Sequence, residues 1–348
     1  MTALIELDDV KVHYGVRKGV FARRLVGVVH AVDGVSITID RGETLGLVGE
    51  SGSGKTTLGR AILRVVEPTH GRVLFHRDGK PVDLRGLERA EMRRMWRHMQ
   101  LIFQDPYASL NPRMTVRDII AEPLVANGIG NAAEIADRVA DMVRRVGLSL
   151  EHLGRYPHAF SGGQRQRISI ARALVLRPEF IVCDEPVSAL DVSIQAQILN
   201  LLKELQEELG LTYLFIAHDL AAVSYVSDRV AVMYLGQIVE LAPTSQLYYA
   251  PRHPYTEALM SAIPVADPDR AMRPQLLPGE RPDPANPPSG CRFHTRCPYA
   301  DAACRNDPPA LVERAAGHWV ACHHADRLTL RGATVDAAVP QPALSTTA

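Results

Sequence analysis

The sequence lacks any apolar run that approaches the roughly 20 residues of a membrane-spanning helix. It also lacks an excess of charge of one sign, because its 39 lysines and arginines balance 39 aspartates and glutamates. This balance removes the electrostatic argument for nucleic-acid binding, so no nucleic-acid partner is expected. Residues 1–9 show neither the basic nor the apolar region of a secretory signal, and we expect the chain to remain in the cytoplasm.

Cysteine is scarce, with only five residues in the chain. Cys183 stands alone in an apolar run and is interpreted as a buried thiol. Hydrophobic residues make up 46% of the 348 positions and charged residues 22%. This composition is typical of a globular enzyme with material for two or three domains.

Residues 49–56 form a complete phosphate-binding loop, Gly-Glu-Ser-Gly-Ser-Gly-Lys-Thr. The apolar run at 44–48 predicts a buried strand before it, and residues 57–63 predict the helix after it. Glycines let backbone N–H groups turn toward phosphate oxygens, and the helix N-terminus adds partial positive charge. We expect Lys55 to reach the β- and γ-phosphates and the Thr56 hydroxyl to ligate Mg²⁺. The predicted nucleoside-triphosphate site comprises Gly49, Glu50, Ser51, Gly52, Ser53, Gly54, Lys55, Thr56 and Thr57.

A second apolar strand is predicted at residues 180–183 and ends in the carboxylates of Asp184 and Glu185. Functional groups gather at this carboxyl edge of parallel sheets. We expect Asp184 to hold Mg²⁺, directly or through water, and Glu185 to polarise the attacking water. In another sequence the pair would be two solvated acids at the end of a core strand. The phosphate loop favours the catalytic interpretation.

Two further polar residues also follow apolar runs. His218 closes the run at 212–217 and is expected to hydrogen-bond the γ-phosphate or the attacking water, although a lone histidine there is often structural. Gln104 follows residues 101–103 and offers a side chain that can reach both Mg²⁺ and water. It would therefore sense whether the γ-phosphate is present.

Residues 160–167, Phe-Ser-Gly-Gly-Gln-Arg-Gln-Arg, predict a second helix start that can receive an anion. Ser161 is a good helix N-cap, and Ile168, Ala171 and Leu174 continue at helical spacing. One γ-phosphate does not need two such helix starts. We therefore interpret one of them as serving a neighbouring molecule.

In their order along residues 4–245, these motifs resemble ATP-binding-cassette ATPases. The resemblance implies a head-to-tail dimer that hydrolyses two ATP molecules, with Mg²⁺, between its chains. Tyr14 matches the aromatic residue that stacks on adenine. The residues that would complete the partner's site are Ser161, Gly162, Gly163, Gln164 and Asp191.

The predicted fold is α/β, a three-layer P-loop NTPase core with an antiparallel β subdomain and a helical subdomain. Residues 4–48 are strand-rich, and the units after the phosphate loop predict a mainly parallel sheet. Residues 105–176 are mainly helical and are expected to be interrupted at Pro106, Pro112, Pro123 and Pro157. By resemblance, this is the helical subdomain, which with the Gln104 loop would form the groove for a short permease helix. The cassette is expected to span residues 1–248.

Residues 103–114, 184–193 and 253–256 narrow the resemblance to bacterial oligopeptide and dipeptide importers, and to the second of their two ATPase subunits. It implies a similar but different ATPase partner, two membrane permeases and an external binding protein. The chain would lie peripherally on the cytoplasmic face of the inner membrane. Nickel and glutathione importers share this ATPase type, so the cargo stays open at this point.

Two other classes share part of this pattern. A non-transport cassette ATPase that acts on ribosomes or DNA would carry two fused cassettes or long coiled coils, whereas this chain has one cassette and no sustained heptads. A P-loop kinase would share the phosphate loop but has no reason to carry the Ser-Gly-Gly-Gln segment. Both are disfavoured.

Residues 249–331 are predicted to form a C-terminal extension with a proline-rich linker at 264–288, and residues 332–348 a disordered tail. The extension holds Cys291, Cys297, Cys304 and Cys322, separated by five, six and seventeen residues. Disulfides are not expected in the cytoplasm, which favours a metal site.

Three interpretations of the four cysteines stay open. Their separations are wider than those of structural zinc pairs. Four thiolates can also hold a [4Fe–4S] cluster, and some peptide-importer ATPases that this tail resembles carry one. A mixed zinc site with nearby histidines, or thiols without metal, are the alternatives; the histidines are His294, His318, His323 and His324. A metal would stabilise a short module that has little apolar core.

Overall fold

The computed structural model describes residues 2–18, 24–77, 79–263 and 277–333. Residues 264–276 of the predicted linker and residues 334–348 of the tail predicted at 332–348 lie outside these ranges. The first two residues of that tail are described and packed, since the N–H of Ala333 donates to the carbonyl of Tyr248 at 2.7 Å. The chain divides into two compact units. The first unit consists of Met1–Asp8, Ser36–Leu45 and Leu58–Ala217, and the second of Asp9–Val35, Gly46–Thr57 and His218–Ala348.

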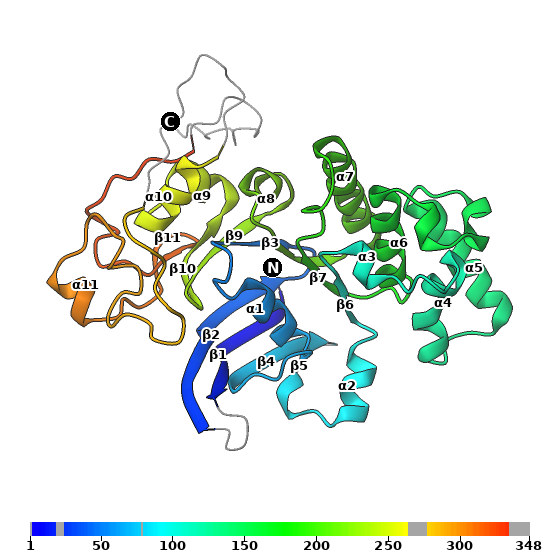
Figure 1. Ribbon diagram of the computed structural model, residues 1–348, viewed down its shortest axis with the longest axis horizontal. Coiled ribbons are helices and arrows are strands. Elements are labelled where there is room, and N and C mark those ends of the chain that lie inside the picture. The colour runs from blue at the N-terminus through cyan, green and yellow to red at the C-terminus, as the bar shows by residue number, and fades with distance from the viewer. Residues whose placement is uncertain (1, 19–23, 78, 264–276, 334–348) are drawn as a thin grey trace, which may run out of the picture. The chain divides into compact units, whose positions relative to one another are not determined.

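The smaller of two sheets has the strand order β2-β1-β4-β5. Its strands are β1 (Ala3–Lys18), β2 (Arg24–Asp40), β4 (His70–Arg77) and β5 (Lys80–Asp83), which lie side by side in Figure 1. β4 and β5 pair antiparallel, with Leu74 opposite Asp83. The long strands β1 and β2 contribute residues to both units. A strand-rich N-terminal region was predicted, and these strands confirm it.

The first unit contains three adjacent parallel strands of the larger sheet, β6 (Met99–Ile102), β7 (Phe180–Asp184) and β8 (Thr212–Ile216). Every residue of β7 and β8 is buried, as in parallel strands covered on both faces. Helix α1 (Lys55–Ile62) packs closely on them, because a Cβ on Gly59 would lie 2.9 Å from side-chain carbons of Val182 and Ile216. This packing places the end of β7 beside α1.

Helices dominate the first unit outside the sheet. They are η1 (Leu84–Gly86), α2 (Arg89–Met95), α3 (Pro106–Ser109), α4 (Val116–Ala126), α5 (Ala132–Arg145), η2 (Leu150–Gly154), η3 (Pro157–Ala159), α6 (Gly162–Leu174) and α7 (Val192–Leu209). Helices α3 to α6 pack on one another, as Figure 1 shows.

One expectation about the prolines of this region is wrong. Pro106 and Pro157 begin the short helices α3 and η3, at positions where no intrahelical N–H bond is lost. Pro123, however, lies inside α4 and does not end it. Tertiary packing overrides the local preference, because five apolar residues of α4 are buried. The five are Val116, Ile119, Ile120, Ala121 and Leu124.

The second unit holds the other strands of the larger sheet, in the order β11-β12-β10-β9. They are β9 (Arg229–Tyr234), β10 (Gln237–Pro243), β11 (Val312–Ala315) and β12 (His318–Val320), with α8 (Leu220–Val226), α9 (Thr244–Tyr249), α10 (Pro254–Ser261) and α11 (Ala302–Asn306). These four strands pair antiparallel. The predicted parallel arrangement therefore holds for β6 to β8 but not here, because the short turn between β9 and β10 makes a hairpin.

β3 (Thr44–Val48) lies between β9 and β8 in the strand order and belongs to both units. It is buried throughout, and its bounds match the predicted strand before the phosphate loop. The phosphate loop therefore begins directly at the end of a core strand.

A buried polar group fixes the start of α10. The carboxylate of Glu240 accepts hydrogen bonds from the backbone N–H groups of Arg252 (2.7 Å) and His253 (3.0 Å), and lies 2.6 Å from Nε2 of His318. His253 Nδ1 accepts the N–H of Tyr255 at 3.1 Å. Burial lowers the pKa of His253 to about 3, so its ring is neutral and free to accept. Tyr255 is thereby held in place.

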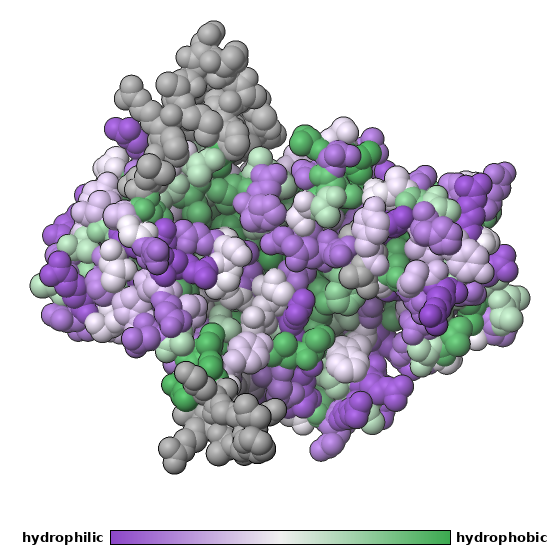
Figure 2. All heavy atoms as spheres, in the orientation of Figure 1, coloured by the Kyte–Doolittle hydropathy of each residue, from purple (hydrophilic) through white to green (hydrophobic). Residues whose placement is uncertain are grey.

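No helix in the described part of the chain is long and apolar enough to cross a membrane. Figure 2 shows hydrophilic side chains over much of the visible face, interspersed with smaller hydrophobic patches.

Candidate functional site

The phosphate loop connects β3 to α1 and depends on two glycines. Gly49 has φ of 150°, and a Cβ there would lie 2.2 Å from the carbonyl oxygen of Met233. Gly54 has φ of 111°, and a Cβ there would lie 2.1 Å from the carbonyl oxygen of Ala31. No larger residue fits either position without moving the backbone. The loop is therefore pressed against its own unit.

Lys55 lies across this loop. Its Nζ donates hydrogen bonds to the carbonyl oxygens of Gly49 (2.7 Å) and Glu50 (3.0 Å), and the side chain is buried. The first turn of α1 contains no acidic residue, which leaves the positive end of its dipole uncompensated by side-chain charge. The loop and helix start together form a cationic anion-binding site. Ser51, Gly52, Ser53, Thr56 and Thr57 belong to the same stretch.

Glu50 differs from the other loop residues because the C-terminal extension engages it. Its N–H donates to the hydroxyl of Tyr255 at 2.8 Å. Its carboxylate oxygens accept from Nη1 of Arg296 at 2.9 and 3.1 Å. Sequence reasoning assigned no role to Tyr255 or Arg296, although residues 253–256 stood out as a subfamily marker.

The predicted catalytic carboxylates of the first unit lie at the end of β7. Asp184 is 3% exposed, and its carboxylate lies 3.9 Å from Nη2 of Arg60 on α1. Glu185 has a positive φ of 48°, an unfavourable conformation for a residue other than glycine. Its N–H donates to the carbonyl of Ile216 at 2.9 Å, which helps to hold that conformation. Strained backbone of this kind concentrates at functional sites.

Gln104 and Glu185 meet in the structure. Nε2 of Gln104 donates to Oε2 of Glu185 at 2.7 Å, across 81 positions of sequence. This contact fixes the amide orientation and leaves the other Gln104 atom, Oε1, available as an oxygen ligand. The predicted water-polarising and γ-phosphate-sensing residues are therefore neighbours.

The remaining candidates are placed separately. His218 follows β8 and is exposed, and Tyr14 lies on β1 with 43% of its surface exposed. Both belong to the second unit with the phosphate loop, whereas Gln104, Asp184 and Glu185 belong to the first. Asp191 is the exposed N-cap residue of α7.

Ser161 begins α6 in a complete capping box. Its Oγ accepts the N–H of Gln164 at 3.3 Å, and its own N–H donates to Oε1 of Gln164 at 3.0 Å. A Cβ on Gly163 would lie 2.5 Å from Cγ2 of Ile194, so only glycine allows α6 to approach α7 this closely. Ser161 itself is exposed at the positive end of the helix. The predicted anion-receiving helix start is thus present on the surface.

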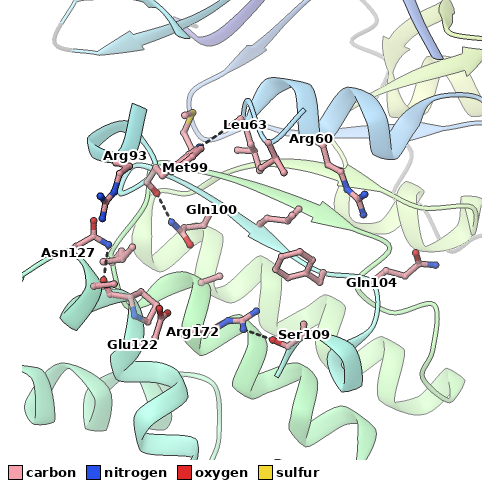
Figure 3. Close-up of a pocket in the computed structure, with 18 of the residues that line it drawn as sticks. Arg60, Leu63, Arg93, Met99, Gln100, Gln104, Ser109, Glu122, Asn127 and Arg172 are labelled. Carbon is pink, nitrogen blue, oxygen red and sulfur yellow. Dashed lines mark hydrogen bonds between the residues drawn. The ribbon is translucent and has the colours of Figure 1, made fainter. Parts of the chain in front are cut away.

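A groove of about 1450 Å³ lies in the first unit. Its lining includes Val65, Trp96, Phe103, Gln104, Glu122 and Arg172. Figure 3 shows Arg60 and Gln104 at one end of the groove and Arg93 and Asn127 at the other. Arg172 donates to the carbonyl of Ser109 at 2.6 Å, and burial lowers its pKa. The groove therefore combines apolar side chains with a partly desolvated cation.

The four C-terminal cysteines lie in one segment of the second unit. Burial and the neighbouring cysteines raise the pKa of Cys291 to about 11 and that of Cys297 to about 12, so free thiols are protonated at neutral pH. Cys304 Sγ lies 3.5 Å from Nε2 of His324, which is 3.2 Å from the carboxylate of Asp301. The N–H of His324 points to Sγ of Cys322 at 3.4 Å.

The other candidate histidines have different partners. His318 pairs with Glu240, and Nε2 of His323 lies 2.9 Å from the carbonyl oxygen of Asp307. His294 Nδ1 lies 2.9 Å from the carbonyl oxygen of Cys291. His324 is therefore the predicted histidine whose ring nitrogen approaches a thiol.

Two known families match the chain, one after the other along the sequence. Residues 32–188 match the ABC transporter family, and residues 239–304 match the oligopeptide/dipeptide transporter C-terminal region. The chain is 53% identical over 323 residues to the oligopeptide transport ATP-binding protein AppF of Bacillus subtilis. This match covers 92% of this chain and 97% of AppF. It is 54% identical over 321 residues to a putative peptide import ATP-binding protein of Brucella ovis, covering 92% of this chain and 98% of that one.

Solved structures agree. The dimeric ATP-binding cassette MJ0796, in a post-hydrolysis state with ADP and Pi, has a TM-score of 0.59 and 28% identity. The match covers 69% of this chain and 98% of that cassette.

The chain therefore belongs to the ATPase subunits of ABC transporters, with a C-terminal region of the oligopeptide/dipeptide type. The predicted family and the α/β P-loop fold class are confirmed. The predicted class of enzyme is also confirmed: an ATPase that binds ATP, typically with Mg²⁺, and hydrolyses it to drive transport. ATPases of this family work with permease subunits in a membrane transporter.

Proposed function

We propose that the chain drives bacterial import of dipeptides or oligopeptides as one of two similar but different ATPase subunits. The pair lies peripherally on the cytoplasmic face of the inner membrane, beneath two permeases that receive cargo from an external binding protein. The observation that carries the proposal is the peptide-transporter region at residues 239–304, which lies beyond the general cassette. Two relatives that match this chain over nearly their whole length are named for oligopeptide transport and for putative peptide import.

The phosphate loop, residues 49–57, binds the triphosphate. Lys55 exchanges its bonds to the carbonyls of Gly49 and Glu50 for bonds to phosphate oxygens, since a hydrogen bond from a cation to an anion is stronger than one to a neutral carbonyl. Tyr14 stacks on adenine with its exposed ring. Glu185 polarises the attacking water, and His218 contacts the γ-phosphate.

The donor set fits Mg²⁺, which prefers hard oxygen ligands. Thr56 supplies a hydroxyl, Asp184 a carboxylate and Gln104 the amide oxygen that its bond to Glu185 leaves available. Bound there, the ion would neutralise phosphate charge. Gln104 holds Glu185 through Nε2 and would hold the ion through Oε1, so loss of the γ-phosphate would alter both contacts.

The exposed start of α6 serves the partner chain. Ser161, Gly162, Gly163 and Gln164 present a helix N-terminus without an acidic side chain in its first turn. Asp191 lies at the seam between the chains. ATP thus favours the closed dimer because it contacts both chains, and hydrolysis removes those contacts.

The groove beside Gln104 receives the permease. Its lining combines Val65, Phe103 and Trp96 with the cation of Arg172, which suits a short amphipathic helix. Because Gln104 lines one end of the groove, closure of the ATP site moves the permease contact directly.

Co-purification and uptake test this assignment. The chain should co-purify from detergent with two multispanning proteins, and the reconstituted complex should import labelled dipeptides or oligopeptides. Replacing the exposed Val65 by Glu places a charge in the groove and is expected to reduce uptake and co-purification about tenfold, since charge at an interface core is strongly disfavoured. The matched control Leu150→Glu, also exposed but outside the groove lining, should behave like the wild type.

Three outcomes contradict parts of the proposal. Import of nickel or glutathione instead of peptides would change the cargo. Recovery on ribosomes without permeases would overturn the transport role. Normal uptake by the Val65→Glu variant would remove the groove as the permease contact.

The C-terminal cysteines are proposed to hold a metal centre, with [4Fe–4S] as the preferred form. Four thiols in one short segment, with an N–H group directed at the sulfur of Cys322, match the donor set of such clusters. The alternative is zinc at Asp301, Cys304 and His324, whose ligand atoms lie within 4.8 Å of one another. In either form the metal ties the segment together rather than taking part in ATP hydrolysis.

Anaerobic purification followed by iron, sulfide and zinc analysis distinguishes these forms. We expect brown protein with about four irons per chain, lost on Cys297→Ser because a cluster needs each thiolate. Stoichiometric zinc without sulfide, retained in Cys297→Ser but lost in Cys304→Ser, would replace the cluster with the mixed site. The matched control Cys183→Ser removes a fully buried thiol of β7 and should keep the metal.

A further inference from the structure

The C-terminal extension reaches back to the phosphate loop at Glu50. The two sides of this contact are separated by 205 positions at Tyr255 and 246 at Arg296. All the residues involved belong to the second unit. The contact therefore joins the region typical of peptide transporters to the residues expected to bind ATP.

The Arg296 contact is strong by its geometry. Nη1 of Arg296 lies 2.9 and 3.1 Å from the two carboxylate oxygens of Glu50 and 3.4 Å from the hydroxyl of Tyr234. The Arg296 side chain is only 10% exposed and that of Glu50 28%. Burial disfavours the Arg296 charge, but hydrogen bonds to Glu50 and Tyr234 outweigh it and raise its pKa. The Arg296 end of the pair is therefore largely shielded from water, and the Glu50 end is partly shielded.

Tyr255 engages the backbone of the same residue. Its hydroxyl accepts the Glu50 N–H at 2.8 Å, and its ring is fully buried against Tyr234 and Phe293. Burial raises the pKa of Tyr255, so the hydroxyl stays neutral. The backbone N–H of Glu50 is thus hydrogen-bonded to the extension. The N–H groups of the later loop residues are the ones left to bind phosphate.

A further cation from the extension lies at this loop. The guanidinium nitrogens of Arg281 would be 3.0 and 3.1 Å from a Cβ on Gly52. The extension therefore brings positive charge to a loop in which Glu50 is the one acidic side chain.

Electrostatics gives this arrangement a consequence for binding. A carboxylate beside a triphosphate site repels the ligand, more strongly where water is partly excluded. A guanidinium paired with that carboxylate cancels most of the repulsion and fixes the orientation of the carboxylate. We propose that Arg296 and Tyr255 are positioning residues for the phosphate loop, which hold Glu50 so that its charge is balanced and its backbone fixed when ATP binds.

The inference deepens the proposed ATP site and rests on the role assigned there to the phosphate loop. It makes the C-terminal region a determinant of ATP affinity rather than only a mark of the transporter's cargo class. Arg296 directly precedes Cys297, so whatever orders the cysteine segment also places Arg296.

ATP affinity of the purified full-length chain tests the proposal. Arg296→Ala leaves the Glu50 carboxylate unpaired, and we expect ATP binding about tenfold weaker, with KM raised in the assembled transporter and kcat little changed. Adding Glu50→Gln to Arg296→Ala removes the orphaned charge and should restore affinity to within about threefold. A residue that served folding alone would not be rescued by this change.

Two more variants keep the test decisive. Tyr255→Phe retains the packed ring but loses the acceptor for the Glu50 N–H, and should weaken ATP binding severalfold. The matched control is Arg292→Gln, because Arg292 also reaches back from the extension but pairs with Asp33 and the carbonyl of Leu235. That variant should bind ATP normally.

The outcomes separate this proposal from the ATP-site assignment. Normal affinity in both Arg296→Ala and Tyr255→Phe would overturn the positioning role. So would a loss in Arg296→Ala that Glu50→Gln fails to rescue. Should Lys55→Ala bind ATP as well as the wild type, the phosphate-loop assignment itself would be wrong. If Arg296→Ala does not fold, Arg296→Lys carries the test, and should recover part of the affinity as a point charge.

Discussion

Replacing Glu185 by Gln is expected to reduce ATP turnover at least about a hundredfold while ATP binding is retained. The amide keeps the shape of the side chain and can still accept from Nε2 of Gln104. It removes the negative charge that polarises the attacking water. Because Asp184 and Thr56 are untouched, Mg²⁺ binding should not change. kcat in the assembled transporter and ATP affinity of the isolated chain measure the two effects separately.

A matched control lies at the other end of the same strand. Glu179 precedes β7 and forms an ion pair with Arg41 at 2.7 Å, away from the carboxyl end of the strand. Glu179→Gln should cost little turnover, since partly exposed ion pairs contribute about 1 kcal/mol or less. If Glu185→Gln retained most of the wild-type turnover, the assignment of Glu185 as the water-polarising group would be contradicted.

Backbone strain explains why this prediction depends on position as well as charge. The positive φ of Glu185 directs its side chain out of the strand alternation, and the hydrogen bond to Ile216 holds it there. The sequence alone predicted Mg²⁺ binding for Asp184 and polarisation of water for Glu185. The geometry adds the physical difference between them, because it buries Asp184 beside α1 and leaves Glu185 partly exposed against Gln104.

The sequence predicted best what local patterns encode. The bounds of β3 and β7 followed from apolar runs, because a strand buried on both faces is apolar along its interior, and the polar residues Thr44 and Asp184 stand only at strand ends. The start of α6 followed from Ser161, because both residues of its capping box lie within four consecutive positions. Motifs of this kind carry their own geometry, which is why the phosphate loop is recognisable from its residues and their spacing.

Long-range contacts were not accessible in the same way. The three residues of β12 are too few to show a period, and they form a strand because β10 and β11 pair with them on either side. Glu50 was predicted only as a member of the phosphate loop, since nothing local indicates partners more than 200 residues away. Pro123 was expected to interrupt a helix that packing maintains.

Replacing Ser161 by Arg is expected to disable ATP hydrolysis in the site formed by the partner's phosphate loop, while the isolated chain binds its own ATP nearly normally. The substitution puts a long cation in the exposed helix start where the partner's γ-phosphate would lie, so it would disturb that one composite site. Labelling the assembled transporter with a photoreactive ATP analogue should show trapped nucleotide on this chain and little on its partner.

The effect of lost helix capping must be separated from this role, because removing an N-cap costs about 1 kcal/mol by itself. Ser149 provides the control, since it is an exposed N-cap of the short helix η2 in the same unit and has no predicted place at the dimer seam. Ser149→Arg should lose a similar cap bond but keep nucleotide trapped on both chains.

Weakened ATP binding by the isolated Ser161→Arg chain would mean that the α6 start acts within its own chain. Equal trapping on both chains would mean that it contacts no nucleotide at all. With the expected result, the two anion-binding helix starts of this sequence serve different ATP molecules, and neither chain completes a hydrolytic site without the other.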